Sequence, residues 1–289
     1  MLQEMLLLHG CIIKMKNINV ETNRKADLNN DLRDFTDILR NSGFTPEEFL
    51  FHSRPYVDGL KTILDRFEES IRSKCGFIGR HVLDLGCGSG LTSFLLSRRG
   101  FIVDAIDIYD TNEDIQDTFK KKGKDSQALL WKNLSATAPD RLRFGHYDGI
   151  EIPFDDNFFD HIFAHAVIEH IPVERLWKVI EGLYRILKSG GYLTISRAPN
   201  KFALTEFLVK SHDTFFSKHE IIELFADRFD LVKYRRTDFF PEHFPGKLQG
   251  LINSVSPLLG VLDLAISLSP LSIFSHHHFI ILQKVTTRE

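Results

Sequence analysis

Short apolar runs alternate with amphipathic stretches through the middle of the chain. Five runs read as strands, in order from Arg80: RHVLDLG, FIVDAID, RLRFGHY, FDHIFAHA and GYLTISRA. Helical spacing of apolar residues fills the intervals, at 89–99, about 125–137, 173–188 and 218–228. Strands that are apolar throughout are usually covered on both faces by crossover helices, which also makes them parallel. The sequence therefore predicts an α/β fold with a doubly wound, mostly parallel sheet and helices on both faces.

Two further strand-like stretches, FDLVKYRRTDFF and FSHHHFIILQKV, follow near the end of the chain. We expect them to pair antiparallel, which gives a seven-stranded sheet with an antiparallel last strand. The predicted organisation is an N-terminal extension at 1–26, N-terminal helices at 27–76, a core at 77–240, an apolar helical insertion at 241–273 and a final edge strand at 274–289.

The net charge limits the kinds of partner that the chain can bind, and the cysteines indicate its redox compartment. The formal net charge is -3, so no basic field is available to hold a nucleic-acid backbone. The three cysteines show no CxxC spacing, which argues against structural zinc and suits a reducing compartment. The first residues lack the basic leader and small-residue cleavage site of a signal peptide, so we expect a cytoplasmic protein.

Three glycines follow the first predicted strand: Gly86, Gly88 and Gly90 in HVLDLGCGSG. Glycine in regular structure costs roughly 0.5–1 kcal/mol against alanine, so this loop needs positive φ angles or the close approach of a ligand. A P-loop is excluded because Leu91, and not lysine, follows Gly90. The spacing GxGxG also departs from the dinucleotide fingerprint GxGxxG, but it keeps the close approach of a ligand to the backbone.

Four segments in order resemble the class I S-adenosylmethionine-dependent methyltransferases, above all the type 11 and ubiquinone-pathway O-methyltransferase-like members. VLDLGCGSG resembles motif I, and GFIVDAIDIYD resembles the second strand with its acidic end. HYDGIEIPFDDNFFDHIFAHAVIEHI resembles the passage from strand three into strand four, and LYRILKSGGYLTIS resembles the approach to strand five. The resemblance covers about residues 80–198. It implies a Rossmann-like methyltransferase fold and S-adenosyl-L-methionine as the cofactor.

The resemblance also implies how the cofactor is held. Asp84 would take its amino group, Asp107 its ribose hydroxyls and Asp148 its adenine amino group. Asp107 lies 23 residues after Asp84, close to the ~20 residues expected before an acidic ribose ligand. The implied cofactor-binding residues are Asp84, Gly86, Cys87, Gly88, Gly90, Asp107, Ile108, Asp148, Gly149 and His165. We interpret Cys87 as a packing residue and not as a nucleophile.

Two histidines are the candidate catalytic residues. Methyl transfer from a sulfonium is a direct displacement that needs alignment and, for a protonated acceptor, a base. His165 falls where the family often has a polar residue beside the methyl site. SHDTFFSKHEIIELF resembles a stretch that enters a helix over the active site, which makes His212 the candidate base. The alternative, that His212 only orders its loop, stays open. Ser217 and Glu220 predict a capping box for the helix that follows.

Two histidine-containing runs could suggest a metal, and we predict none. VIEHI resembles part of the metal-binding run of small-RNA 2′-O-methyltransferases, but Ala166 stands where that run has its first glutamate. We therefore interpret His170 as a turn residue. The run His276–His278 is interpreted as part of the final edge strand, with His277 opposite the other two.

These observations favour transfer of a methyl group to a small-molecule or lipid-like acceptor, at oxygen. The alternatives are an RNA or protein methyltransferase and a catalytically silent cofactor-binding scaffold. The insertion carries apolar residues at helical spacing: Leu248, Leu251, Ile252, Val255, Leu258 and Leu259. We expect it to form a lid over an apolar acceptor. A homodimer contact and peripheral membrane contact through 247–272 are the other uses of its apolar face.

Overall fold

The computed structural model describes residues 28–49, 54–72, 80–108, 118–119, 121–122, 125–203, 214–240 and 247–285. The predicted extension at 1–26 lies outside them. The strands are β1 (His81–Leu85), β2 (Ile102–Ile108), β3 (Leu142–Tyr147), β4 (Phe159–His165), β5 (Leu187–Pro199), β6 (Phe229–Thr237) and β7 (His277–Lys284). The α-helices are α2 (Leu28–Asn41), α3 (Arg54–Arg72), α4 (Leu91–Arg98), α6 (Ser126–Ala136), α7 (Val173–Ile186), α8 (Lys218–Glu223) and α9 (Lys247–Ser267). Short 3-10 turns are η1 (Pro46–Glu48), η3 (Ile168–His170) and η5 (Pro270–Phe274).

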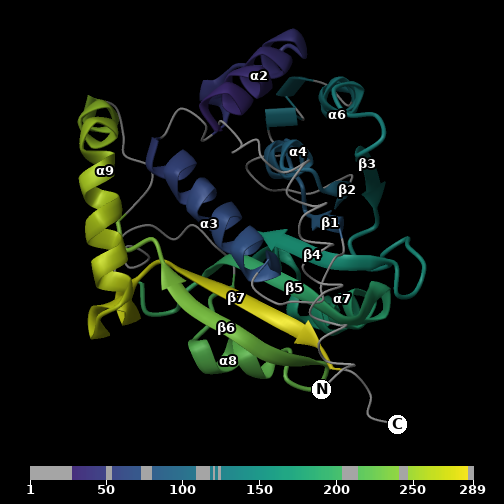
Figure 1. Cartoon of the computed structure of the whole chain (residues 1–289), viewed down its shortest axis with the longest axis vertical. Helices are drawn as coiled ribbons and strands as arrows, with labels where there is room; N and C mark the ends of the chain where they lie inside the picture. Colours follow the sequence, from purple (N-terminus) through teal and green to yellow (C-terminus); the bar gives the residue numbers. More distant parts are fainter. Residues whose placement is uncertain are drawn as a thin grey trace, which may run out of the picture.

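All seven strands form one sheet in the order β3-β2-β1-β4-β5-β7-β6 (Figure 1). The first five strands pair in parallel, whereas β7 is antiparallel to both β5 and β6. The prediction of a mostly parallel seven-stranded sheet with an antiparallel last strand is confirmed. Because β7 is antiparallel to both neighbours, β6 runs in the same direction as β5. The carboxyl ends of β1, β2, β3, β4, β5 and β6 therefore share one edge of the sheet.

The predicted position of the final strand at the sheet edge is wrong. The strand expected within 274–289 is β7, which lies between β5 and β6, and β6 is the edge strand. Residues 279–282 in β7 are fully buried, because β7 has a neighbouring strand on each side and an apolar core on each face. The charged side chains Lys233, Arg235 and Arg236 lie partly exposed on β6, as suits an edge strand.

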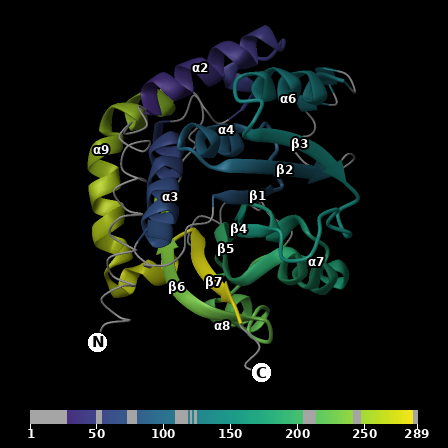
Figure 2. The same ribbon diagram turned by 45° about the vertical axis from the view of Figure 1, so that its right-hand side comes forward.

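Two apolar cores cover the two faces of the sheet, because strand side chains alternate in direction. Val82 and Phe163 pack with α2, α3, α4 and α6 on one face. Their chain neighbours Leu83 and Ile162 pack with α7 and α8 on the other. Figure 2 shows these two helical layers on either side of the strands. The helices thus fix the strands so that their carboxyl ends meet at one edge.

The apolar stretch between β6 and β7 contains one long helix, α9. It lies beside α3 in both views (Figures 1 and 2), and Ser256 on α9 donates a hydrogen bond to Asp58 on α3 at 2.9 Å. None of the helices within the described ranges has both the length and the apolar character needed to cross a membrane. Apolar side chains that stay largely exposed on α9 and just after it are Leu251, Leu258, Val261, Leu262, Leu264, Leu268 and Leu271.

Candidate functional site

The predicted cofactor-binding residues gather where the parallel strands end. Gly86 directly follows β1, Asp107 and Ile108 end β2, Asp148 directly follows β3, and His165 ends β4. Ligands of open α/β sheets bind outside the carboxyl ends of the strands. The fold therefore places these separate sequence segments at the edge of the sheet that suits a ligand.

The glycine loop after β1 needs glycine for its own packing. Gly86, Gly88 and Gly90 have φ angles of 68°, 51° and 83°. A Cβ on Gly86 would lie 2.6 Å from Val167, and a Cβ on Gly90 would lie 2.8 Å from the Phe144 ring. The positive φ expected from the sequence is present. Two of the glycines are required by side chains of this chain, whatever ligand approaches the loop.

Asp107 and Trp131 hold Gly88 through two separate hydrogen bonds. The Gly88 amide donates to Asp107 Oδ2 at 2.6 Å, and Asp107 Oδ1 accepts the Ile108 amide at 2.8 Å. Trp131 on α6 donates from Nε1 to the Gly88 carbonyl at 3.0 Å, and its ring stacks on Phe144 with centroids 5.3 Å apart. The sequence analysis missed Trp131. Its only sequence signal is a place on the helix between the second and third strands.

Burial sets the protonation of the two titratable groups beside this loop. Asp84 is buried, and its Oδ2 accepts the Ser93 hydroxyl at 2.5 Å. Burial raises the pKa of Asp84 to about 7, with a smaller upward contribution from the nearby Asp107 carboxylate. Burial also raises the pKa of the Cys87 thiol, so this thiol stays neutral. A neutral buried thiol lacks the thiolate character that a reactive cysteine needs.

The turn after β3 brings Asp148 beside the end of β2. Asp148 Oδ1 accepts the amides of Ile150 at 2.8 Å and Glu151 at 2.7 Å, and these bonds lower the pKa of its exposed carboxyl group. Gly149 has a φ of 81°, and a Cβ there would lie 3.0 Å from Ile108 Cγ2. Asp148 is therefore ionised near neutral pH, and Gly149 permits close contact between the two strand ends.

His165 is a neutral imidazole at the end of β4. Its Nδ1 lies 2.8 Å from Ser196 Oγ. Its Nε2 is buried and has no hydrogen-bond partner within the part of the chain that the structure describes. Burial and the Arg197 guanidinium lower the pKa of His165 well below its ordinary value. Nε2 therefore has one unused hydrogen-bonding position, as donor or acceptor.

Backbone strain is found at the same edge of the sheet. Ala166 after β4, Arg197 in β5 and Asp238 after β6 have φ angles of 54°, 63° and 63°. Arg197 also sits at a register shift between Ser196 and Ala198, as in a β-bulge. Such conformations cost of order 1–3 kcal/mol each and cluster at functional sites. The sequence analysis singled out neither Arg197 nor Asp238, because left-handed backbone leaves no composition signal at a non-glycine residue.

The short turn after β4, η3, contains Glu169 and His170 of the run VIEHI, which resembles part of a metal-binding motif. His170 Nε2 lies 3.8 Å from Glu169 Oε1, and Glu169 is buried while His170 is exposed. In the described ranges, no three or more His, Cys, Asp and Glu side chains group in a way that could hold a metal ion.

The histidine run before and within β7 is engaged in structural hydrogen bonds. His277 Nδ1 lies 3.0 Å from Asp238 Oδ2. His278 Nε2 lies 2.8 Å from the Phe216 carbonyl, and its Nδ1 lies 2.8 Å from the Tyr234 hydroxyl. Burial lowers the pKa of each of these two histidines to about 4, so both are neutral.

The second candidate catalytic residue, His212, lies outside the described residues. The helix start predicted just after it is confirmed. Ser217 Oγ accepts the Glu220 amide at 3.2 Å, and Glu220 Oε2 accepts the Ser217 amide at 2.6 Å. This is the expected capping box at the start of α8.

Residues 83–195 match a protein family described as a methyltransferase domain. Residues 83–195 are therefore a methyltransferase domain, and its sheet topology fits the class I S-adenosylmethionine-dependent type. The match begins within β1 and ends within β5, so it spans every strand end that carries a predicted cofactor-binding residue. It also supports S-adenosylmethionine as the cofactor of the domain.

Curated relatives of the methyltransferase domain share its sequence over a limited span. A 27-O-demethylrifamycin SV methyltransferase of Amycolatopsis mediterranei is 28% identical over 117 residues, which are 40% of this chain and 38% of that protein. A ubiquinone biosynthesis O-methyltransferase of Coxiella burnetii is 31% identical over 125 residues, 43% of this chain and 46% of that one. The chain thus spans less than half of the length of these relatives.

The fold also has solved counterparts. The MccD protein aligns with a TM-score of 0.50 and 18% sequence identity, over 77% of this chain and 96% of its own. At this identity the likeness concerns the fold alone.

Proposed function

We propose that this chain transfers a methyl group from S-adenosylmethionine to an oxygen atom of a small-molecule or lipid-like acceptor. The single observation that carries the proposal is the position of Asp107, which lies beside the glycine loop within the matched methyltransferase domain. The names of two curated relatives, one in ubiquinone biosynthesis and one acting on a 27-O-demethylrifamycin, support a small acceptor methylated at oxygen.

The donor and acceptor chemistry of the sheet edge fits this cofactor. A carboxylate offers about four lone-pair sites, and Asp107 uses its oxygens here for two backbone amides. We propose that the ribose hydroxyls donate to this carboxylate. The exposed, ionised Asp148 can accept from an adenine amino group. We propose that the glycine loop, together with Asp84 in β1 directly before it, binds the methionyl part of the cofactor.

Bound S-adenosylmethionine supplies a methyl group on a sulfonium, and the protein's part is to place the acceptor in line with it. We assign His165 to orient the acceptor hydroxyl through Nε2. Its lowered pKa makes this imidazole a weak proton acceptor, so a second group has to remove the hydroxyl proton. We propose His212 for that step, since an ordinary histidine pKa of about 6.5 suits it.

We further propose that α9 makes peripheral contact with a bilayer surface. Its exposed face is mostly apolar, and the exposed fraction of Val261, for example, is 66%. The helix contains only two charged residues, Lys247 and Asp263, so contact would depend on apolar burial and not on anionic lipid. Flotation with neutral phosphatidylcholine vesicles tests this. Binding lost in Val261→Asp is expected, whereas a dimer in solution without vesicle binding would favour the homodimer contact instead.

Methyl-labelled cofactor tests the proposed function. The purified protein is incubated with labelled S-adenosylmethionine and either a cell lipid extract, total RNA or total protein. We expect label in an organic-soluble product that is stable to ribonuclease and protease. Label in RNA or protein would favour those acceptor classes. Binding of the cofactor without transfer to any fraction would favour the silent scaffold.

A further inference from the structure

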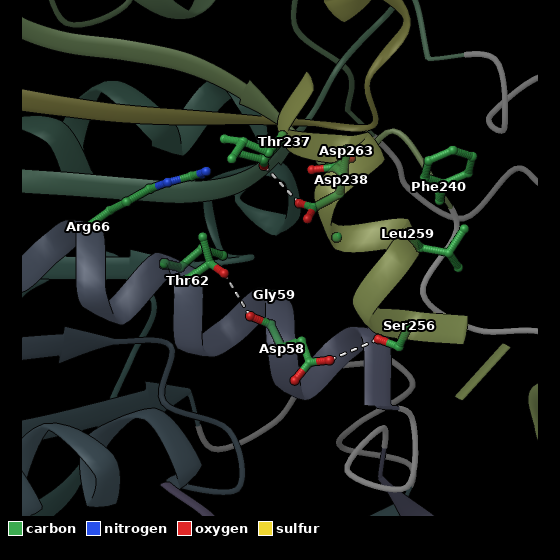
Figure 3. Close-up of a pocket in the computed structure, with 13 residues that line it drawn as sticks. Asp58, Gly59, Thr62, Arg66, Thr237, Asp238, Phe240, Ser256, Leu259 and Asp263 are labelled. Carbon is green, nitrogen blue, oxygen red and sulfur yellow. Dashed lines mark hydrogen bonds between the residues drawn. The ribbon is translucent and has the colours of Figure 1, made fainter. Parts of the chain in front are cut away.

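A cavity of about 330 Å³ lies between α3 and α9, beside the end of β6 (Figure 3). Its volume falls within the ~300–1,000 Å³ typical of small-molecule pockets. Helix α3 contributes Asp58 and Arg66, the end of β6 contributes Asp238, and α9 contributes Leu259 and Asp263. None of the cofactor-binding residues implied by the resemblance lines it.

The topology puts this cavity at the same sheet edge as the cofactor-binding residues. β6 is parallel to β5, because β7 is antiparallel to both. Thr237 and Asp238, which line the cavity, therefore lie at the carboxyl edge, on the side of β5 away from the glycine loop. An acceptor of the methyl group has to approach the cofactor from this edge.

A short series of contacts joins the cavity wall to His165. Asp238 Oδ2 lies 3.0 Å from His277 Nδ1 and accepts the Thr237 hydroxyl at 2.8 Å. Arg197 is close enough to lower the pKa of both Asp238 and His165. The wall residue Asp238 thus belongs to the same charged cluster as the imidazole that we assign to the acceptor hydroxyl.

The lining describes the kind of molecule that would bind. Three carboxyl groups and one guanidinium face the cavity, from Asp58, Asp238, Asp263 and Arg66. An anion would meet this excess of negative charge, whereas hydroxyl groups can donate to the carboxylates. Apolar side chains, Leu259 among them, supply the rest of the wall.

We propose that this cavity holds the methyl acceptor, and that the acceptor is an uncharged, hydroxyl-bearing molecule with an apolar body. The proposal rests on the methyl transfer proposed above and adds the binding site and substrate class. Gly260 on α9 lines the cavity, and a Cβ there meets nothing within 4 Å. A larger side chain at this lining position therefore begins in open space.

Calorimetric titration of 4-octylcatechol, as an uncharged probe, into the protein saturated with S-adenosylhomocysteine tests the proposal. We expect the wild-type protein to bind this probe at least tenfold more tightly than 3,4-dihydroxybenzoate, which carries a carboxylate. Gly260→Phe should weaken 4-octylcatechol binding at least tenfold. The control Val261→Phe places the same ring on the exposed side of α9 and should leave binding within twofold. All three proteins should bind S-adenosylhomocysteine equally.

Three results would overturn the proposal: wild-type protein that fails to bind 4-octylcatechol, equal binding of the anionic probe, or a Gly260→Phe variant that binds like the wild type. The comparison of the two probes needs no variant, so it holds even if Gly260→Phe does not fold. Failure of the proposed methyl transfer is a separate outcome, in which the probe binds but no methylated product forms from S-adenosylmethionine.

Discussion

The carboxylate of Asp107 accepts the Gly88 amide at 2.6 Å, so one side chain at the end of β2 fixes the loop at the end of β1. The same carboxylate is the residue that we assign to the ribose of the cofactor. Asp107 therefore contributes to the loop position and, in the proposed binding mode, to ribose binding, so its removal should affect both.

Replacement of Asp107 by alanine should weaken binding of S-adenosylhomocysteine. A hydrogen bond to a charged group contributes about 1.5–3 kcal/mol, so affinity should fall roughly 10- to 150-fold. Isothermal titration calorimetry measures this, with the exposed Asp140→Ala as the matched control. Unchanged affinity in Asp107→Ala would show that the ribose is bound elsewhere.

Trp131 should support cofactor binding without touching the cofactor. Trp131→Phe keeps a ring to stack on Phe144 but removes the hydrogen bond to the Gly88 carbonyl. A net hydrogen bond contributes about 0.5–1.5 kcal/mol, so the dissociation constant for S-adenosylhomocysteine should rise roughly 2- to 12-fold. Trp177, which is 54% exposed, supplies the control Trp177→Phe. Equal affinity of the two variants for S-adenosylhomocysteine would show that the Trp131 hydrogen bond to Gly88 does not support cofactor binding.

Gly90 and Gly100 form a matched pair for the packing of the glycine loop. Both have positive φ, 83° and 91°, but a Cβ on Gly90 would lie 2.8 Å from Phe144, whereas a Cβ on Gly100 meets nothing within 4 Å. Each alanine substitution carries the cost of left-handed backbone, about 1–2 kcal/mol. Overpacking adds about 1–3 kcal/mol at Gly90 alone. Urea denaturation should therefore show the larger loss of stability in Gly90→Ala, and equal losses would contradict the packing described here.

Asp84 should make stability depend on pH. Burial raises its pKa from an ordinary 3.8 to about 7, so the folded protein holds this proton more tightly than the unfolded chain. The stabilisation from this proton is complete below about pH 4 and is lost as the pH rises through 7. Buried His277, with its pKa lowered to about 4, contributes the opposite trend at acidic pH.

The comparison is therefore between the wild type and Asp84→Asn. The difference between their free energies of unfolding, from denaturant titrations at pH 4 to 7.5, should shift against the wild type as the pH rises. Since His277 is present in both proteins, its contribution cancels. A difference that is constant with pH would mean that Asp84 has an ordinary pKa.

The strands, their crossover helices and the positive φ angles of the glycine loop after the first strand could be predicted because each leaves a local signal. Apolar runs mark buried strands, and Gly86, Gly88 and Gly90 mark a turn with positive φ. The place of β7 inside the sheet could not be predicted in this way. Antiparallel pairing of β6 with β7 allows either strand to be the edge strand. The structure identifies β7 as the inner one, because β5 pairs with it on its other side.

The cavity that we propose for the acceptor was less predictable for a different reason. It joins side chains from α3, the end of β6 and α9, and Asp58 lies 198 residues before its hydrogen-bond partner Ser256. Such contacts leave no spacing pattern in a single sequence. Arg197 and Asp238 have left-handed backbone conformations. In a sequence, only a glycine indicates such a conformation.

A crystal structure of the chain grown with S-adenosylhomocysteine tests the central claim most directly. The account predicts the ribose hydroxyls within hydrogen-bonding distance of the Asp107 carboxylate, the methionyl part along the backbone of residues 86–90, and the sulfur facing the end of β4. S-adenosylhomocysteine bound in the cavity between α3 and α9, or bound without contact to Asp107, would contradict it.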